Sequence, residues 1–205
     1  MNLELQKTLL DRYPKFFRKP GQRMVLAACP PGVPMDIIAP TGVHRFEVRA
    51  KSKHAEDYLE DDTSVFDHRG IECGDGWYRI IDRVACAFEN AIGAMVRENV
   101  SAERWPRVRQ IKEKFGVLRI YVGITGEMPE ALAAAIKEAE HASARTCEAC
   151  GLLGKLRKGG WVHVSCDTCE ARHLERKARP FDTHTFVNHE QFAHDLRALL
   201  EARPE

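Results

Sequence analysis

The 205-residue sequence lacks several features that would place it in a broad class. It has 31 basic and 30 acidic residues, so its net charge of +1 creates no overall attraction to nucleic acid or to an anionic membrane. No apolar run approaches the roughly 20 residues that a membrane-spanning helix needs. Internal repeats and low-complexity tracts are also missing. The first residues, MNLELQKTLLDRYP, do not form a basic segment followed by an apolar one, so we expect a cytoplasmic location.

Cysteine is the most informative residue type. Four of the seven cysteines form two C-x2-C pairs separated by fifteen residues: Cys147, Cys150, Cys166 and Cys169. Two thiolate pairs on one hairpin can meet at a single tetrahedral ion, usually zinc, and a reducing cytosol favours metal over disulfides. The spacing therefore predicts one structural Zn²⁺ ion with no open position for water or substrate. We expect the other cysteines to be small buried apolar residues: Cys29, Cys73 and Cys86.

The residues around the cysteines predict a compact module. Cys147–Gly151 has the composition of a zinc knuckle, and Lys155–Arg157 and Trp161–Val164 are expected to pair as a hairpin around two glycines. A helix is expected to begin after Cys166, with Cys169 in its first turn, where the helix dipole favours a thiolate. Knuckle, hairpin and helix in this order predict a treble-clef zinc finger. A zinc ribbon, with both cysteine pairs on knuckles, is the alternative.

The rest of the chain is predicted to be α+β, a small body of helices and a strand pair. Helical periodicity occupies residues 3–12 and 77–99, and an alanine-rich helix should begin at Pro129. Strands are expected at 108–112 and 117–122, around the turn KEKFG. A β-meander is expected within residues 24–50, a short helix at 54–60, and a final helix capped by Asn188.

These elements suggest four units along the chain. The N-terminal helix and meander occupy 1–60, the central α+β core 61–145, the zinc module 146–180 and a docked C-terminal helix 181–205.

The segment from Glu72 to Trp77 combines two carboxylates, a thiol, two glycines and an aromatic ring. As a site loop, it would use Cys73 as a nucleophile, or Glu72 and Asp75 as acid and base. As a structural turn, it would place Asp75 as the cap of the long helix and Trp77 as an anchor in the core. The structural interpretation is favoured, because no histidine is positioned in the sequence to activate the thiol.

Histidines offer two further metal or catalytic hypotheses. His163 on the hairpin and His173 on the following helix occupy regions that carry metal ligands in HNH-type nucleases. However, the hairpin has no Asp-His pair, and Glu170 follows the last cysteine where such nucleases often have histidine. His189 and His194 resemble a metalloprotease motif but are five residues apart, so they point to different helix faces and do not form a chelating pair.

Three segments together resemble a known family. They are IECGDGWYRIIDRV at 71–84, QIKEKFGVLRIYV at 110–122 and the cysteine segment that runs from RTCEACG to SCDTC at 145–169. In this order they resemble a family of uncharacterised bacteriophage and prophage proteins, over about residues 66–170. The resemblance implies a phage-encoded, zinc-binding protein of the host cytosol. It implies no activity and transfers no catalytic residue.

From these features we expect a non-enzymatic zinc protein that binds a host or phage protein complex, for example as an inhibitor of a host defence such as a CRISPR effector. Neither a membrane nor a small-molecule cofactor is expected. A nucleic-acid-binding zinc finger is the alternative, because basic residues line the predicted hairpin and helix: Lys155, Arg157, Lys158, Arg172, Arg176 and Arg179. An HNH-like nuclease or another enzyme is the third hypothesis. The partner, the oligomeric state and the role of residues 1–60 stay open.

Overall fold

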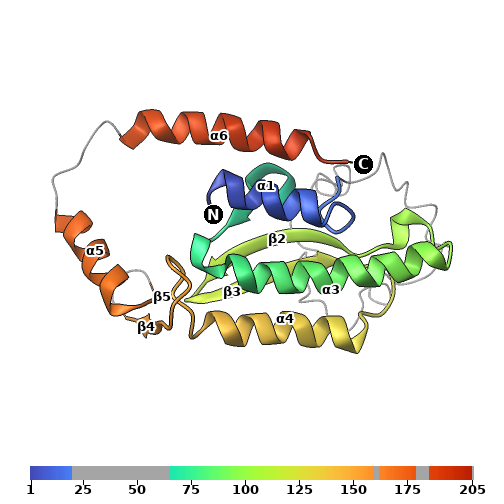
Figure 1. The fold of residues 1–205 in the computed structure, drawn as a ribbon, viewed down its shortest axis with the longest axis horizontal. Coiled ribbons are helices and arrows are strands. Elements are labelled where there is room, and N and C mark those ends of the chain that lie inside the picture. Colours follow the sequence, from blue (N-terminus) through green and yellow to red (C-terminus); the bar gives the residue numbers. More distant parts are fainter. Residues whose placement is uncertain (20–64, 159–161, 179–184, 205) are drawn as a thin grey trace, which may run out of the picture.

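A computed structural model of the chain describes residues 1–19, 65–158, 162–178 and 185–204 (Figure 1). The predicted meander at 24–50, the helix at 54–60, the hairpin glycines and Arg179 lie outside the described residues, as does Cys29. None of the described helices is long and apolar enough to cross a membrane.

A three-stranded sheet forms the centre of the structure. Its strands are β1 (Ile71–Glu72), β2 (Arg107–Lys114) and β3 (Val117–Gly123), with β2 in the middle. β1 runs parallel to β2, whereas β2 and β3 are antiparallel and joined by the turn at Phe115–Gly116. In β3 the side chains alternate between buried and partly exposed, as the sequence predicted.

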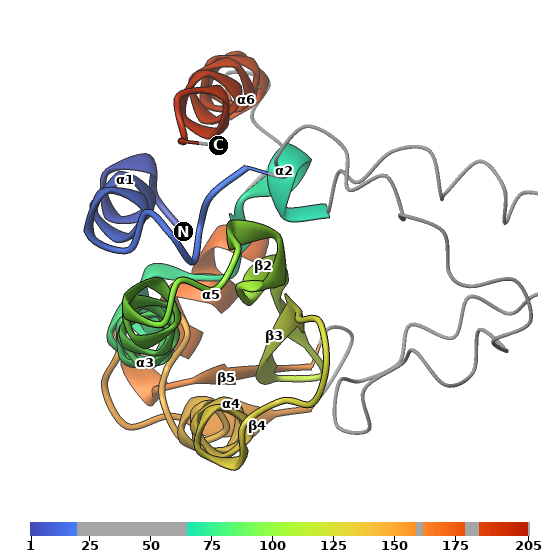
Figure 2. The same ribbon diagram turned by 90° about the vertical axis from the view of Figure 1, so that its right-hand side faces the viewer.

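Two helices, α3 (Tyr78–Arg97) and α4 (Glu130–Ser143), lie on the same side of the β2–β3 pair (Figure 2). A short 3-10 turn at Asp75–Trp77 leads into α3, and another lies at Ala102–Arg104 before β2. The apolar positions of α3 recur at helical spacing and are buried, which explains why this segment is a helix. They are Ile80, Ile81, Val84, Phe88 and Ile92.

Helices from both ends of the chain complete the same core. α1 (Leu3–Arg12) is capped by Asn2, whose side-chain oxygen accepts a 2.9 Å hydrogen bond from Leu5 N. α6 (Thr185–Glu201) contacts α1 and α2 (Val65–Arg69), and its Leu200 is buried. The described part of the N-terminal unit thus shares one hydrophobic core with the central elements, while the division into four units stays a prediction.

The segment that contains the paired cysteines forms two strands and a helix at one end of the molecule. β4 (Lys155–Arg157) and β5 (His163–Ser165) pair antiparallel, and α5 (Asp167–Ala178) follows at once. Figure 1 shows α5 projecting from this end, away from α3 and α4. The predicted order of hairpin and helix is therefore confirmed, with the second strand beginning at His163.

Several local predictions need correction. α2 and β1 lie in a region for which no element was predicted. Pro129 precedes α4 as its N-cap instead of being its first residue, and α6 begins at Thr185, so Asn188 lies inside it. Asp75 does not cap α3, because its carboxylate accepts hydrogen bonds from Asn2, at 2.7 Å from the backbone N and 2.8 Å from Nδ2.

A buried ion cluster joins the C-terminal residues to the sheet. The carboxylate of Asp67 lies 2.6 Å from a guanidinium nitrogen of Arg203 and 3.4 Å from one of Arg107. All three side chains are at least nine-tenths buried. Arg203 also donates to the carbonyl oxygens of Phe17 and Leu200, so this one cation connects α2, α6 and the end of the N-terminal segment.

Replacing Asp67 by Asn should be strongly destabilising, because it removes the buried carboxylate that the guanidinium groups of Arg107 and Arg203 share. We expect the free energy of unfolding in urea to fall by about 3 kcal/mol. Asp11→Asn is the matched control: Asp11 pairs with Lys7 on the exposed surface, so the expected change is below about 0.5 kcal/mol. Equal effects of the two substitutions would contradict this account of the ion cluster.

Candidate metal centre

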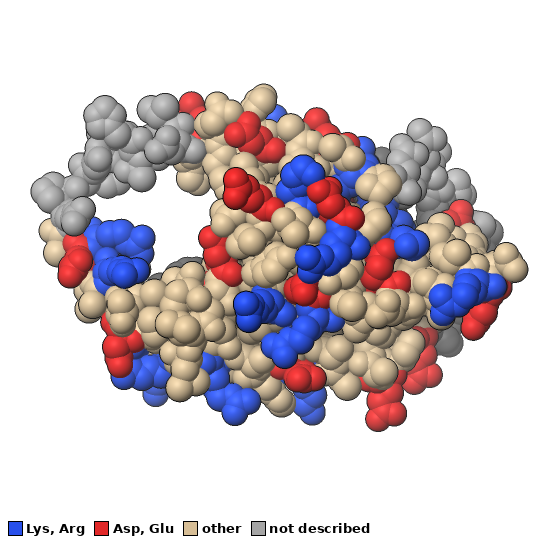
Figure 3. All heavy atoms as spheres, viewed as in Figure 1, with Lys and Arg blue, Asp and Glu red and all other residues tan. Residues whose placement is uncertain are grey.

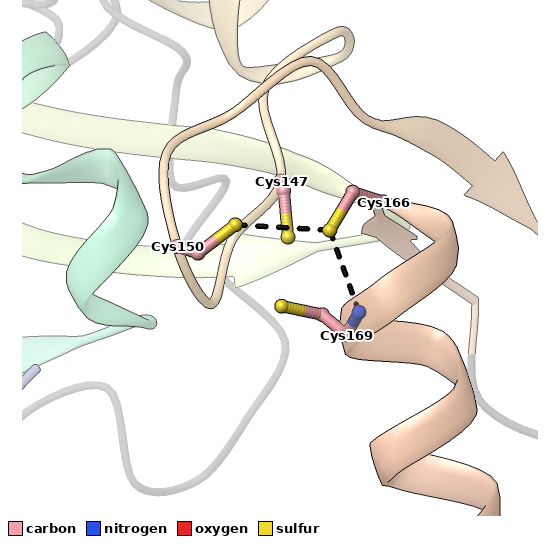
Figure 4. Close-up of side chains that lie close together, drawn as sticks. All are labelled: Cys147, Cys150, Cys166 and Cys169. Atoms are coloured by element: carbon pink, nitrogen blue, oxygen red, sulfur yellow. Dashed lines mark hydrogen bonds between the residues drawn. The ribbon is translucent and has the colours of Figure 1, made fainter.

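The four paired cysteines converge at one point. Their sulfur atoms all lie within 4.8 Å of one another, and the Sγ atoms of Cys150 and Cys166 are 3.7 Å apart (Figure 4). Metal–sulfur bonds of about 2.3 Å in a tetrahedron require sulfur–sulfur distances of about 3.8 Å. The cluster therefore has the size and the donor set for one tetrahedral metal ion held by four thiolates.

The first pair is shaped by a tight backbone turn. Gly151 N donates to Cys147 O at 2.9 Å, and Cys147 N donates to Leu152 O at 2.7 Å. Gly151 has φ of +78°, a conformation that residues with a Cβ rarely adopt. Glu148 N donates to Val164 O at 3.0 Å, which fixes the knuckle to β5.

The second pair sits at the start of α5. The sulfur of Cys166 accepts a hydrogen bond from Cys169 N at 3.4 Å, so this cysteine caps the helix. No residue of α5, all of which the structure describes, is buried. The position of α5 therefore depends on Cys166 and Cys169 at its start, which belong to the sulfur cluster, and on its contact with the hairpin.

The protein environment prepares one thiol for metal binding. Burial opposes ionisation of Cys147, but hydrogen bonds from three backbone N–H groups of the module outweigh it and lower its pKa to about 6. Cys169 behaves in the opposite way, since burial and the neighbouring thiols raise its pKa to about 12. A metal ion that binds these thiols must displace the protons that they hold.

The turn before α3 packs against the backbone of this knuckle. Gly74 N donates to the carboxylate of Glu148 at 2.9 Å, and Gly76 N donates to the Glu148 carbonyl oxygen at 2.8 Å. A Cβ on Gly76 would overlap the backbone oxygen of Cys147 and the nitrogen of Gly151. The backbones thus approach more closely than any side chain would allow. Sequence reasoning missed the role of Glu148, which carries no signal beyond its place between two cysteines.

Trp77 ties the same turn to the body of the protein. Its ring is fully buried in the core, and its Nε1 donates to Thr146 O at 2.8 Å, directly before the first cysteine. The predicted anchoring role of Trp77 is confirmed. One short segment therefore connects the metal knuckle to the hydrophobic core.

The β2–β3 turn contacts the other side of the metal module. A Cβ on Gly116 would lie 2.5 Å from the Leu156 side chain of β4, and the neighbouring atoms belong to Val162 and His163. The predicted hairpin at Lys112–Gly116 is confirmed. All three sequence segments that carry the family resemblance thus meet around the cysteine cluster.

The Glu72–Trp77 segment does not have the arrangement of a catalytic site. Cys73 is buried, and burial raises its pKa to about 12, so it stays a neutral thiol. The carboxylate of Glu72 lies 3.2 Å from both Arg69 Nη1 and Gln110 Nε2, whereas that of Asp75 is bound to Asn2. The two carboxylates therefore serve different structural contacts.

Two hollows, of about 130 and 380 Å³, lie between α3 and α4 and beside the buried ion cluster. Neither hollow is lined by a residue of the Glu72–Trp77 segment or by one of the four paired cysteines.

The histidines of the module lie together but do not form a second metal group. His163 Nε2 is 2.7 Å from the carboxylate of Glu170, and the rings of His163 and His173 have centroids 5.2 Å apart. In the described part of the chain, the four cysteines are the only group of three or more ligand-type side chains that meets at one point. The contact between His163 and Glu170 instead holds α5 against β5.

The predicted binding cations have different surroundings. Lys155 and Arg157 both pair with Asp167, at 2.9 and 2.6 Å, and this pairing lowers the Asp167 pKa to about 2. Lys158, Arg172 and Arg176 are exposed. Figure 3 shows basic side chains on α5 and an alternation of basic and acidic groups over the rest of the visible face.

Comparison with known proteins adds no relative: no protein-family model, curated sequence or solved structure matches the chain. The resemblance to phage proteins therefore stays a prediction.

Substitution of Cys147 by Ser should remove the metal and loosen α5. We expect about one metal ion per wild-type chain by elemental analysis and much less in the variant, with a loss of several kcal/mol of stability and of helical circular dichroism. Cys86→Ser is the control, since this partly buried thiol on α3 lies outside the cluster. A fully folded Cys147→Ser variant that keeps its metal would refute the assignment.

Substitution of Gly76 by Ala tests the close packing between the turn before α3 and the cysteine turn. The added methyl group must push the cysteine turn away from the core, so we expect a loss of about 2 kcal/mol in unfolding free energy and weaker metal retention against a chelator. Gly93→Ala within α3 makes the same chemical change in open surroundings and should stabilise by up to about 1 kcal/mol. A neutral Gly76→Ala variant would show that the close approach is dispensable.

Proposed function

We propose that this chain is a zinc-binding protein without a catalytic role, and that its metal module is a treble-clef finger. Four thiolates are the preferred donor set of structural zinc, and they leave no coordination position for a substrate. The order of knuckle, hairpin and helix, with one cysteine pair at the start of α5, supports the treble clef over a ribbon. The ribbon would place the second pair on another knuckle, where the chain instead has a helix.

We further propose that the module presents a surface to a macromolecular partner. One observation carries this proposal: α5 and the hairpin are held in a fixed position by the cysteine cluster, yet none of the side chains of α5 is buried. A helix that contributes no side chain to the core leaves its side chains available to a partner. The candidate catalytic groups, by contrast, are engaged in structural contacts.

The class of partner follows from the family resemblance. If the chain is phage-encoded, a protein complex in the host cytosol is the expected target, and inhibition of a host defence such as a CRISPR effector is one form of that role. Binding of nucleic acid is the second candidate, favoured by the exposed Arg172 and Arg176 on one side of α5. The pairing of Lys155 and Arg157 with Asp167 reduces the basic surface available for it.

The proposal predicts a stable complex in a bacterial lysate. Tagged protein with its metal bound should elute from a sizing column together with a protein partner, also after nuclease treatment and at moderate salt. The Cys169→Ser variant, which loses the order of α5, should elute alone. Co-elution that disappears with nuclease or salt would favour the nucleic-acid alternative, and elution of the wild type alone in every condition would contradict an interaction role.

A further inference from the structure

Exposed apolar side chains gather at the metal end of the molecule. Four of them come from the β2–β3 turn, the exit of the knuckle and β4, and we call them the tip patch. They are Phe115, Leu152, Leu153 and Leu156, with exposed fractions of 73%, 67%, 82% and 47%. The described chain has three other large exposed apolar side chains, on α3, α5 and α6. Clustered exposure of this kind marks interaction sites in soluble proteins.

The metal module brings these segments together. The turn that carries Phe115 packs on Leu156 through Gly116. Leu153 forms a β-bridge with Thr146, next to the first cysteine, and Leu156 pairs with Val164 in the hairpin. Figure 1 shows the β2–β3 turn and the β4–β5 hairpin at the same end of the structure. The patch therefore combines the β2–β3 turn with segments that directly follow the first cysteine pair.

Phe115 is kept where its backbone disfavours it. It has φ of +56° and is followed by Gly116 at +79°, the two left-handed positions of a type I′ turn. Asparagine or glycine suits the first of these positions, and a bulky side chain there is unusual. A strained, exposed aromatic residue contributes little to the fold, so a binding role is a reason for its presence.

The charges around the tip patch are basic on balance: four cations surround it, against Asp167 and the carboxylate of Glu113, which accepts from Gly116 N at 2.5 Å. Lys114 and Lys158 are exposed beside it, and the ammonium of Lys114 lies 5.5 Å from the centre of the Phe115 ring. Lys155 faces Asp167, which is shared with Arg157, so this pair of cations exceeds its one carboxylate. An apolar centre with a basic rim is complementary to a partner with apolar and acidic side chains.

We infer that the tip patch binds an acidic protein segment that inserts apolar side chains between Phe115 and the leucines. This inference rests on the proposed interaction function and specifies its surface. A protein is favoured over single-stranded nucleic acid because three of the four side chains are aliphatic. Leucine gives apolar contact area but has no aromatic face on which a base can stack.

Peptide selection can test this surface without a known partner. A display library of random peptides of about 12 residues would be selected against the metal-loaded protein alone, and the retained peptides would then be measured on the patch variants. We expect the retained peptides to be acidic and to contain aromatic or aliphatic residues. Their affinity should fall on the order of tenfold or more in Phe115→Asn and in Leu153→Gln, and should weaken with salt.

The variants separate binding from folding. Asparagine suits the type I′ turn, so Phe115→Asn should raise the urea midpoint while it weakens binding. Phe192→Gln, at the partly exposed aromatic of α6, is the control and should leave peptide affinity unchanged. Basic or neutral retained peptides, equal binding to Phe115→Asn, self-association through the patch, or preferential binding of an oligothymidine would each overturn the inference. If a lysate complex forms but persists with these variants, the surface is wrong and the interaction function stands.

Discussion

The contact between the backbone of Gly76 and the cysteine turn at Cys147 holds the two parts of this protein together. It depends on the lack of a side chain at one position and on two hydrogen bonds to Glu148. Trp77 follows immediately and is fully buried. The metal module is therefore attached to the hydrophobic core through this turn before α3, in addition to the β2–β3 turn that contacts its other side.

The elements that form the core differ from most of those that carry the proposed binding surface. The core is made by α1, α3, α4, α6 and the sheet, and it needs no metal ligand. α5 buries none of its side chains, and two of the four clustered cysteines lie at its start. A metal ion bound by these cysteines would supply the order that burial supplies in the core.

Sequence reasoning succeeded where the pattern is local. The spacing of Cys147 to Cys169, the periodicity of α3 and the alternation in β3 each depend on residues that are close in the chain. It failed where the partner is remote. The CGDGW segment was predicted to be a turn into the helix, but its contact with the cysteine turn was not: Gly74 has a negative φ and is needed for its approach to Glu148, 74 positions away. Asp75 was assigned to its own helix but binds Asn2, 73 positions away. No local pattern encodes such contacts.

The bond between Arg203 and Asp67 spans 136 positions and closes the core from its C-terminal side. Until Arg203 has left the ribosome, Asp67 and Arg107 lack the cation that completes their cluster. This ion cluster therefore forms only after the chain from Asp67 to Arg203 has been synthesised. The four clustered cysteines all lie within residues 147–169, so they can come together without so distant a partner.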